Sequence, residues 1–361
     1  MCRKNNSEEG IVLIVVLIAI AILTTLVVDL MYFTQVDAQI SSNYKEDVQA
    51  EYIARSGVNV VAGTMKNNSL EELENIVSTY NGNESNSKGY WSINVPNFPV
   101  GLGMVSLHVV DERSKINLNA LVNQNSNIVD QQVKEELIEL FELLDVDSSK
   151  YERFISSLIN WTDTDLEGSI NDQEVSGANG DFYRSLDRPY YIKDGPLDSL
   201  EEIKLIDGMD SDLFNIIKDY VTVYPAGKQI NFSTAPKIVI LAALKGATVS
   251  SVEGQGDFQV VDINPDIANN IADNIIAERE NNAIITRADV FKIVRDVDSS
   301  LRINSGLSGV SFSSGKSDTF YVRAEGKLGE DNPTTKIVEA VLRKDFRSNN
   351  GGVNIISWKE N

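Results

Sequence analysis

A long uncharged segment near the N-terminus constrains this 361-residue chain more than any other feature. The eighteen residues 11–28 (IVLIVVLIAIAILTTLVV) are mostly aliphatic, and Asp29 ends the run. As an α-helix the segment would be about 27 Å long, close to the roughly 30 Å hydrocarbon core of a bilayer. Arg3 and Lys4 precede it, and basic residues in this place favour the cytoplasmic side. We therefore predict a single membrane-spanning helix over 11–28 with a cytoplasmic N-terminus.

Three explanations of this segment differ in what should follow it. A secretory signal peptide would have a shorter apolar region and then a cleavage site of small residues, but Leu, Met, Tyr and Phe follow Asp29. A simple N-terminal anchor is the second explanation. The third, one continuous helix over 11–66, fits best, because no Pro or Gly occurs between Gly10 and Gly57 and apolar residues keep helical spacing to Met65. That helix would be about 80 Å long.

Gly10 stands directly before the apolar run, and this arrangement resembles the leader of type IV pilins and pseudopilins. In that family a prepilin peptidase cuts after the Gly, here Gly10, and the new N-terminal residue, here Ile11, is N-methylated. Most members carry Glu at the fifth mature position, where this chain has Val15. The K-type minor pseudopilin of type II secretion characteristically lacks that Glu. Cleavage at Gly10 would also remove Cys2 with the leader.

The charge balance and the scarcity of two residue types exclude several kinds of site. The chain has 53 acidic and 32 basic residues, a formal charge of −21, which disfavours nucleic acids and anionic headgroups and favours cations. His108 is the single histidine and Cys2 the single cysteine, which excludes His- or Cys-ligated zinc sites and an internal disulfide. We interpret His108 as a surface or packing residue.

The rest of the chain divides into two strand-forming regions separated by a mainly helical block. Alternating apolar residues predict strands over 91–95, 104–110, 320–328 and 336–343. Helical spacing predicts helices over 130–144 and 151–162. Signals for helix starts occur at Ser199 with Glu202, at Thr286 with Asp289, and at Asn264 before Pro265. The tail after Asp345 is rich in Asn and Gly, and we expect it to be mobile.

These elements predict an α+β fold. A pilin-like long N-terminal helix would pack on a small antiparallel sheet, with a large all-α domain inserted between strands. The resulting boundaries are a prepilin leader (1–10), the long helix (11–66), the first part of the pilin α/β domain (67–112), the inserted helical domain (113–306), the second part of the α/β domain (307–345) and a mobile tail (346–361). A large helical insertion of this kind resembles the K-type arrangement.

Residues 163–174, DTDLEGSINDQE, match the template of a calcium-binding loop. The template requires oxygen ligands at six positions and a Gly at the turn, which is Gly168 here. The predicted ligands are Asp163, Asp165, Glu167, the Ser169 carbonyl, Asn171 and Glu174. Five acidic residues in twelve would repel one another without a cation. A solvated acidic loop is the alternative, because the fifth position is usually Asp or Asn and no regular helix follows.

Several further segments resemble the K-type family in the same order. Family members show a Trp, an Asp-x-Asp pair, a Gly-Ala-Glu-Asp segment and a Tyr in a calcium-binding region. This chain has Trp161, Asp163-x-Asp, GANGD (177–181) and Tyr183. The resemblance implies calcium here, with Asp181 as a further candidate ligand because Asn and Gly replace the family's acidic pair. Other matching segments are KINLNALV (115–122), PLDSLEEIKLIDGM (196–209), VTVYPAGKQINFSTAP (221–236) and ILAAL (240–244).

Two other function classes fit parts of the sequence less well. LEEIKLIDGMDSDLFNII (200–217) has the apolar–Gly–apolar turn of a helix-hairpin-helix DNA-binding module, but three aspartates surround Gly208 and would repel phosphate. An anchored hydrolase could use paired carboxylates, yet the sequence has no G-x-S-x-G, H-E-x-x-H or Gly-rich phosphate loop. Asp262, Asn264 and Asp266 have calcium-like spacing, which helix capping explains better.

The resemblance to K-type minor pseudopilins implies a non-enzymatic structural subunit of a type II secretion system. It would cap the pseudopilus tip together with the I- and J-type minor pseudopilins and help to initiate assembly, with structural Ca²⁺ as cofactor and no nucleic acid. Its further partners would be the major pseudopilin, the prepilin peptidase and the inner membrane, crossed once with the bulk of the chain in the periplasm. A minor pilin or adhesin tip of a type IV pilus-like system is the alternative.

Overall fold

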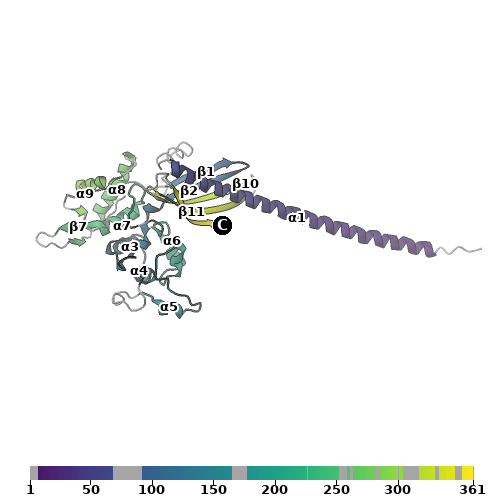
Figure 1. Ribbon diagram of the computed structural model, residues 1–361, viewed down its shortest axis with the longest axis horizontal. Helices are drawn as coiled ribbons and strands as arrows, with labels where there is room; N and C mark the ends of the chain where they lie inside the picture. Colours follow the sequence, from purple (N-terminus) through teal and green to yellow (C-terminus); the bar gives the residue numbers. More distant parts are fainter. Residues whose placement is uncertain are drawn as a thin grey trace, which may run out of the picture.

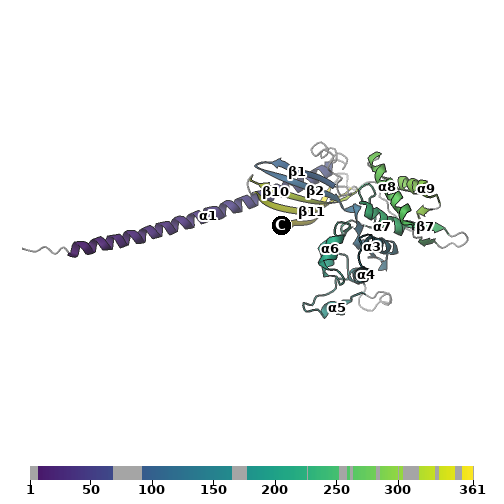
Figure 2. The same cartoon turned by 180° about the vertical axis from the view of Figure 1, so that it is seen from behind.

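The computed structural model describes residues 7–67, 92–164, 177–225, 227–251, 258–260, 263–281, 285–299, 301–303, 317–329, 333–345 and 352–360. Helix α1 (Ser7–Asn67) projects far from the rest of the molecule, as Figures 1 and 2 show. The C-terminal part of α1 packs on a five-stranded sheet. The other helices gather at the opposite end of the molecule from the free part of α1 (Figure 1). The architecture is α+β, which confirms the predicted fold class.

The second half of α1 packs closely on the sheet because small side chains line the contact. Ala50, Ala54 and Gly57 are buried there, followed by Val58, Val61 and Met65. On the sheet side, a Cβ on Gly326 would lie 2.2 Å from the Ala50 carbonyl oxygen. A side chain at this position would push the helix away, so the sequence permits a contact that larger residues would prevent.

The sheet is antiparallel throughout, in the order β1-β2-β10-β11-β12. Its strands are β1 (Ser92–Val100), β2 (Gly103–Asp111), β10 (Thr319–Leu328), β11 (Thr334–Lys344) and β12 (Val353–Glu360). The face toward α1 is apolar and includes Val105, Val322 and Val338. His108 lies on the other face, next to Arg323 in register, and its ring contacts the Asn94 side chain at 2.5 Å.

The C-terminal tail differs from the prediction. We expected residues 346–361 to be mobile, but β12 pairs antiparallel with β11. Its sequence, VNIISWKE, is rich in β-branched and aromatic residues, and the strand extends a sheet whose edge at β11 would otherwise be open. Glu360 also forms an ion pair with Arg55 of α1 at 2.9 Å. An Asn- and Gly-rich connection therefore leads into a strand.

The insert leaves the sheet after β2 and returns at β10, and these two strands are neighbours. Its helices are α3 (Gln131–Leu143), α4 (Ser148–Thr162), α5 (Gly180–Arg184), α6 (Ser211–Ile217), α7 (Lys237–Ala247), α8 (Pro265–Asn281) and α9 (Arg287–Val297). The described part of the insert also contains the 3₁₀ helices η2 (Glu112–Ser114), η3 (Leu118–Ala120) and η5 (Leu200–Leu205). A continuous apolar core joins these elements, with Phe141, Phe154 and Tyr183 among its largest fully buried side chains.

The insert is mainly helical but also contains short strands, which an all-α prediction lacks. They are β3 (Ile116–Asn117), β4 (Val122–Asn123), β5 (Ile128–Val129), β6 (Val221–Thr222), β7 (Thr248–Ser251), β8 (Phe258–Val260) and β9 (Arg302–Ile303). The β4–β5 hairpin forms because Asn127 adopts a φ of 53°, which Asn tolerates better than most residues. Strands this short leave no periodicity to detect.

All three predicted helix-start signals precede a helix. Thr286 and Asp289 form a reciprocal capping box at α9. Asn264 accepts a hydrogen bond from the Asp266 N–H at 2.8 Å, and Pro265 is the first residue of α8. Ser199 is the N-cap residue of η5, but the capping box expected there is absent, because the Ser199 side chain makes no capping bond. Glu202 instead accepts hydrogen bonds from the Trp161 ring N–H and the Asp198 N–H, each at 2.9 Å.

Candidate functional site

The first half of α1 is the largest surface that the rest of the described chain leaves uncovered. Its large apolar side chains from Ile11 to Phe33 are between 47% and 67% exposed. Its most apolar 18-residue window has a mean hydropathy of 3.4, and none of it is buried. Exposing so much contiguous apolar surface to water is unfavourable, so lipid or other helices must cover it. The predicted processing residues Gly10 and Ile11 lie within this helix, and their cleavage and methylation stay predictions.

The predicted metal ligands fall into two groups. Asp165, Glu167, Ser169, Asn171 and Glu174 lie outside the described residues. Asp163 follows the last residue of α4, and its N–H donates to the Ile159 carbonyl at 2.9 Å. Asp181 lies in α5 and pairs with Arg184 at 2.6 Å, with its own side chain 83% exposed. No group of three or more acidic, His or Cys side chains placed to hold a metal occurs among the described residues.

The structure fixes the described residues on both sides of the acidic segment. On the outgoing side, the Thr164 N–H donates to the Asn127 side chain, in the turn between β4 and β5, at 2.9 Å. On the returning side, a Cβ on Gly177 would lie 2.3 Å from the Ser156 carbonyl carbon, so only Gly fits against α4 there. The Ala178 N–H then donates to the Ser157 hydroxyl of α4 at 3.0 Å. The β4–β5 turn and α4 therefore hold the two ends of the segment.

Trp161 near the end of α4 and Tyr183 of α5 belong to an aromatic cluster. Trp161 and Tyr183 contact edge to face with ring centroids 5.2 Å apart, and Tyr190 lies 5.4 Å from Tyr183. Burial raises the pKa of Tyr183 to about 12, and its hydroxyl accepts from the Asp207 N–H at 3.2 Å. The Trp and Tyr of the family motif, which flank the acidic segment in the sequence, thus contact each other.

The apolar–Gly–apolar turn of the supposed DNA-binding hairpin packs against α4. Gly208 has a φ of 90°, and a Cβ there would lie 2.7 Å from the backbone nitrogen of Phe154. Asp207 pairs with Arg153 at 2.6 Å, and Asp210 caps α6 and pairs with Lys150 at 2.7 Å. Packing within the insert therefore explains this pattern.

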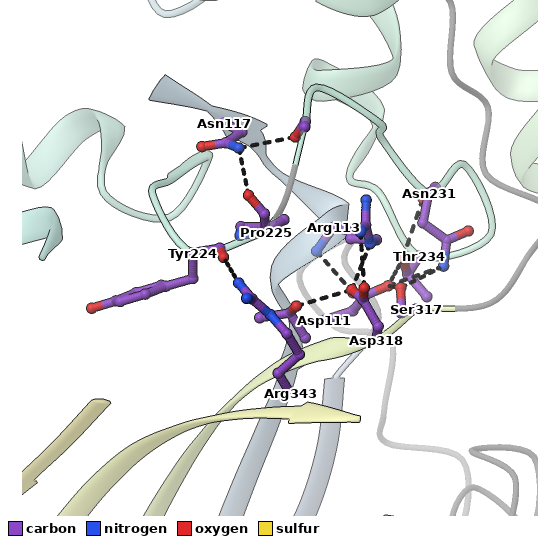
Figure 3. Close-up of polar contacts among 12 residues, drawn as sticks. Asp111, Arg113, Asn117, Tyr224, Pro225, Asn231, Thr234, Ser317, Asp318 and Arg343 are labelled. Atoms are coloured by element: carbon purple, nitrogen blue, oxygen red, sulfur yellow. Dashed lines mark hydrogen bonds and ion pairs between the residues drawn. The ribbon is translucent and has the colours of Figure 1, made fainter. Parts of the chain in front are cut away.

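A buried polar joint connects the sheet to the insert, and sequence reasoning missed it (Figure 3). Asp111, at the end of β2, is fully buried and accepts hydrogen bonds from the hydroxyls of Thr234 (2.6 Å) and Ser317 and from the Asn231 amide (3.0 Å). Burial raises the pKa of Asp111 above its usual value, although these hydrogen bonds oppose the shift. One carboxylate thus joins three segments: the end of β2, the stretch before α7 and the start of β10.

An ion pair fixes the same joint from its other side. Arg113 in η2 donates two hydrogen bonds to Asp318, from Nε at 2.7 Å and from a terminal nitrogen at 3.0 Å (Figure 3). Burial alone would raise the pKa of Asp318, but the hydrogen bonds and charge of Arg113 lower it below its usual value. Asp111 could be read from the sequence only as the end of a strand, because its partners are more than 100 residues away.

The segments that carry the family resemblance meet just beyond this joint. Strands β3 and β6 pair in parallel, and the Ile116 N–H donates to the Tyr220 carbonyl at 2.9 Å. The Asn117 amide donates to the carbonyls of Pro225 and Gly227 at 2.8 and 2.9 Å. The Asn119 amide donates in the same way to Leu197 and Val223. Asn117 and Asn119 of the KINLNALV segment therefore bond to two other segments that resemble the family, 196–209 and 221–236.

Comparisons with known proteins agree with this geometry. The family model "Type II secretion system (T2SS), protein K" matches residues 114–226, which include these asparagines and the acidic loop. Type II secretion system protein K of Klebsiella pneumoniae is 23% identical over 257 residues, 70% of this chain and 74% of its own length. The protein K of Pectobacterium carotovorum subsp. carotovorum is 24% identical over 235 residues, 64% of this chain and 67% of its own length.

A solved structure has the same fold. A chain of the GspK–GspI–GspJ complex from the type 2 secretion system of enterotoxigenic Escherichia coli matches with a TM-score of 0.50 at 17% identity. The match covers 91% of the present chain and 99% of that chain, so it includes both the pilin-like part and the insert. In sequence and in fold the chain is therefore similar to the protein K family of type II secretion systems, the minor pseudopilins that its sequence resembles.

Proposed function

We propose that this protein is a non-enzymatic structural subunit that caps the tip of the type II secretion pseudopilus and helps to initiate its assembly. The observation that carries the proposal is the separation of two parts. The uncovered apolar half of α1 lies at one end of the molecule, and the bulky insert lies at the other end (Figures 1 and 2). A helix of this kind packs lengthwise among the helices of other subunits, whereas a large insert at the far end would obstruct a subunit placed above it.

The residue at position 15 supports a terminal place in the fibre. Most pilins and pseudopilins carry Glu at the fifth mature position, and the reason given is that it neutralises the N-terminal amine of the neighbouring subunit. This chain has Val15 there. A subunit with nothing above it needs no such carboxylate, so its loss removes the cost of placing a charge in an apolar bundle.

The proposed partners follow from the helix and from the solved relative. That relative was crystallised with GspI and GspJ, and the corresponding I- and J-type minor pseudopilins are the partners proposed for this chain. The major pseudopilin would lie below them, the prepilin peptidase would cut after Gly10, and α1 would cross the inner membrane once, with the sheet and insert in the periplasm. The apolar length of α1 supports a membrane position before assembly.

Structural calcium in the acidic loop is part of the proposal. The predicted oxygen ligands are Asp163, Asp165, Glu167, the Ser169 carbonyl, Asn171 and Glu174, a donor set that suits Ca²⁺. The fixed ends of the segment support it, because Thr164 bonds to Asn127 and Ala178 bonds to Ser157 of α4, and fixed ends reduce the conformational entropy lost when the donors come together. Asp181 is a weaker candidate in this fold, since it already pairs with Arg184. Calcium would stabilise the insert without taking part in any reaction.

Calcium binding can be tested on the full-length protein in detergent. After removal of metal with a chelator, calorimetric titration with Ca²⁺ should show saturable binding and a higher melting temperature, since a site filled at a hundredfold excess over its Kd adds about 3 kcal/mol. The double variant Asp163→Ala/Glu174→Ala should lose both effects. The matched double variant Asp262→Ala/Asp266→Ala, at the other calcium-like spacing, should keep them. A melt that ignores chelator would reduce the loop to a solvated acidic turn.

The cellular role can be tested by deletion and complementation. We expect deletion to abolish export of the type II secretion substrates and the wild-type chain to restore it. The I- and J-type subunits should co-purify with the full-length chain. Loss of surface adhesion with secretion intact would instead identify a minor pilin or adhesin tip.

A further inference from the structure

The two edges of the sheet are built differently. Edge strand β1 contains Pro96 and Pro99, which cannot donate backbone hydrogen bonds. Its register shifts between Val95 and Phe98, and Asn97 between them has a φ of 49°. Prolines and bulges are the devices by which proteins prevent a sheet edge from pairing with another chain. This edge is therefore protected.

Edge strand β12 has no such protection on its outer side. It is eight residues long, contains no proline, and pairs only with β11 among the described strands. Three of its large apolar side chains remain exposed: Ile355 (53%), Ile356 (40%) and Trp358 (37%). An open, apolar edge of this length offers backbone hydrogen bonds and side-chain contacts to one more strand.

Backbone pairing with β11 holds β12 in place, and exposed ion pairs at its C-terminal end connect it to other elements. Glu360 pairs with Arg55 of α1 at 2.9 Å, and Lys359 lies 3.6 Å from Glu201 of η5 and 3.9 Å from Glu339 of β11. The strand is thus attached to the helix, the sheet and the insert at once. A strand held in this way is preorganised to accept a partner.

The open edge is continuous with the surface of α1 along which other subunits are proposed to pack. The Arg55 guanidinium, which pairs with Glu360, also lies 5.6 Å from the centre of the Tyr52 ring. Tyr52 is 63% exposed on the helix. A subunit that packs against α1 near Tyr52 and Arg55 would therefore also contact the edge of β12.

A second copy of this chain is a poor occupant of the edge. The strand runs from the end of β11 near the insert back toward the membrane-proximal end of the sheet, as its pairing with Lys344 and then Val338 shows. An antiparallel pair of two β12 strands would point the two α1 helices in opposite directions, which one membrane does not allow. The charge of −21 on each copy would also repel the other.

We infer that β12 is a docking edge, on which a neighbouring minor pseudopilin adds an extended strand to this sheet. The inference rests on the proposed function, because it takes the occupant from the subunits that pack along α1. It assigns a specific contact to the C-terminal strand, with main-chain hydrogen bonds for affinity and the exposed side chains of Ile355 and Trp358 for specificity.

Hydrogen exchange can locate such a contact directly. The full-length chain in detergent would be compared alone and with the I- and J-type subunits of the same system. The outward amides of 353–360 should exchange at least about tenfold more slowly in the complex, and those of β1 should not change. Slower exchange of β12 in the chain alone that depends on its concentration would make a second copy the occupant and overturn the inference.

A matched pair of variants tests the same point by affinity. Ile355→Lys and Phe98→Lys each place a charge on the α1 side of an edge strand, at side chains that are 53% and 39% exposed. We expect Ile355→Lys to weaken association with the partner subunits about tenfold or more and Phe98→Lys to leave it unchanged. Equal melting temperatures of the two variants would show that folding is not the cause. If the wild type binds its partners and Ile355→Lys binds them equally well, the docking edge alone is overturned. If the wild type binds neither partner, the proposed function is overturned.

Discussion

Helix α1 meets the sheet through an apolar contact, and the insert meets the same sheet through a polar one. Alanines, glycines and valines line the first contact, where backbones approach so closely that Gly326 has no room for a Cβ. The second contact is the joint around Asp111 and Arg113, in which hydrogen bonds and an ion pair join three segments. The sheet is thus joined to the helix by close apolar packing and to the insert by buried polar bonds, two different ways of fixing the orientation of one element relative to another.

These two contacts should fail for different reasons. Apolar contacts between small residues are limited by space, so adding atoms is the damaging change. A buried polar contact is limited by its partners, so removing one group leaves the others unpaired in a place that water does not reach. The first contact should also ignore pH, whereas the second contains carboxylates whose pKa values are shifted.

Gly326→Ala should have the largest effect. The new Cβ would lie 2.2 Å from the Ala50 carbonyl oxygen and 2.6 Å from the Ala54 nitrogen, and both are backbone atoms that cannot turn aside. We expect the free energy of unfolding to fall by about 3 kcal/mol or more, measured by thermal melting of the full chain in detergent. The same substitution at Gly63, where no atom lies within 4 Å, should instead stabilise α1 by about 0.5 to 1 kcal/mol. Equal melts of the two variants would contradict the close contact.

Asp111→Ala should come next. It leaves the hydroxyls of Thr234 and Ser317 and the amide of Asn231 without their common acceptor, at a cost of about 2 to 3 kcal/mol. Because the joint connects two separate cores, we also expect calorimetry to resolve two unfolding steps where the wild type shows one. Asp198→Ala, at a side chain that is 88% exposed, serves as the control and should leave the melt unchanged. A single sharp transition in Asp111→Ala would show that the joint does not couple the two parts.

The sequence predicted the first contact far better than the second. The helical spacing of apolar residues in α1 and the alternation in the strand segments are local patterns. The long helix, four of the five sheet strands and the position of the insert could therefore all be predicted from them. Strand β12 was missed because its Asn- and Gly-rich approach resembles a disordered tail. The joint was missed because Asp111 meets partners more than 100 residues away, and no local pattern records such a meeting. The acidic segment 163–174 could be found from a local sequence pattern, but most of its predicted ligands lie outside the described residues, so calcium binding stays a prediction.

Glu136, in the core of the insert, is a second buried carboxyl that should make stability depend on pH. It lies in α3 with 3% exposure, its side chain accepts from the Gln132 amide at 2.9 Å, and burial raises its pKa to about 8. The folded chain therefore holds a proton that the unfolded chain releases above its ordinary pKa of 4.5, so stability should fall as pH rises from about 5 to 8. Glu136→Gln keeps the acceptor without the proton and should raise stability at pH 8 by about 2 kcal/mol, with no gain near pH 4. Denaturant titrations at the two pH values measure this. An equal change at both would mean that the carboxyl is ionised in the folded chain.

The smallest effect should come from an ion pair on the apolar side of the comparison. Arg55 reaches Glu360 at 2.9 Å, much as Arg113 reaches Asp318 at 2.7 Å, but the Arg55 side chain is 37% exposed and that of Arg113 only 8%. Water and salt screen the first pair, so Arg55→Gln should leave the melting temperature within experimental error at any ionic strength. Arg113→Gln should lower it measurably, because Asp318 would lose the partner that lowers its pKa. The contribution of the Arg113 pair should also disappear as pH falls through the lowered pKa of Asp318, since that carboxylate must then take up a proton. Two ion pairs of nearly the same length would thus differ in effect because of burial alone, and equal losses in the two variants would show that the joint is as open to solvent as the edge of the sheet.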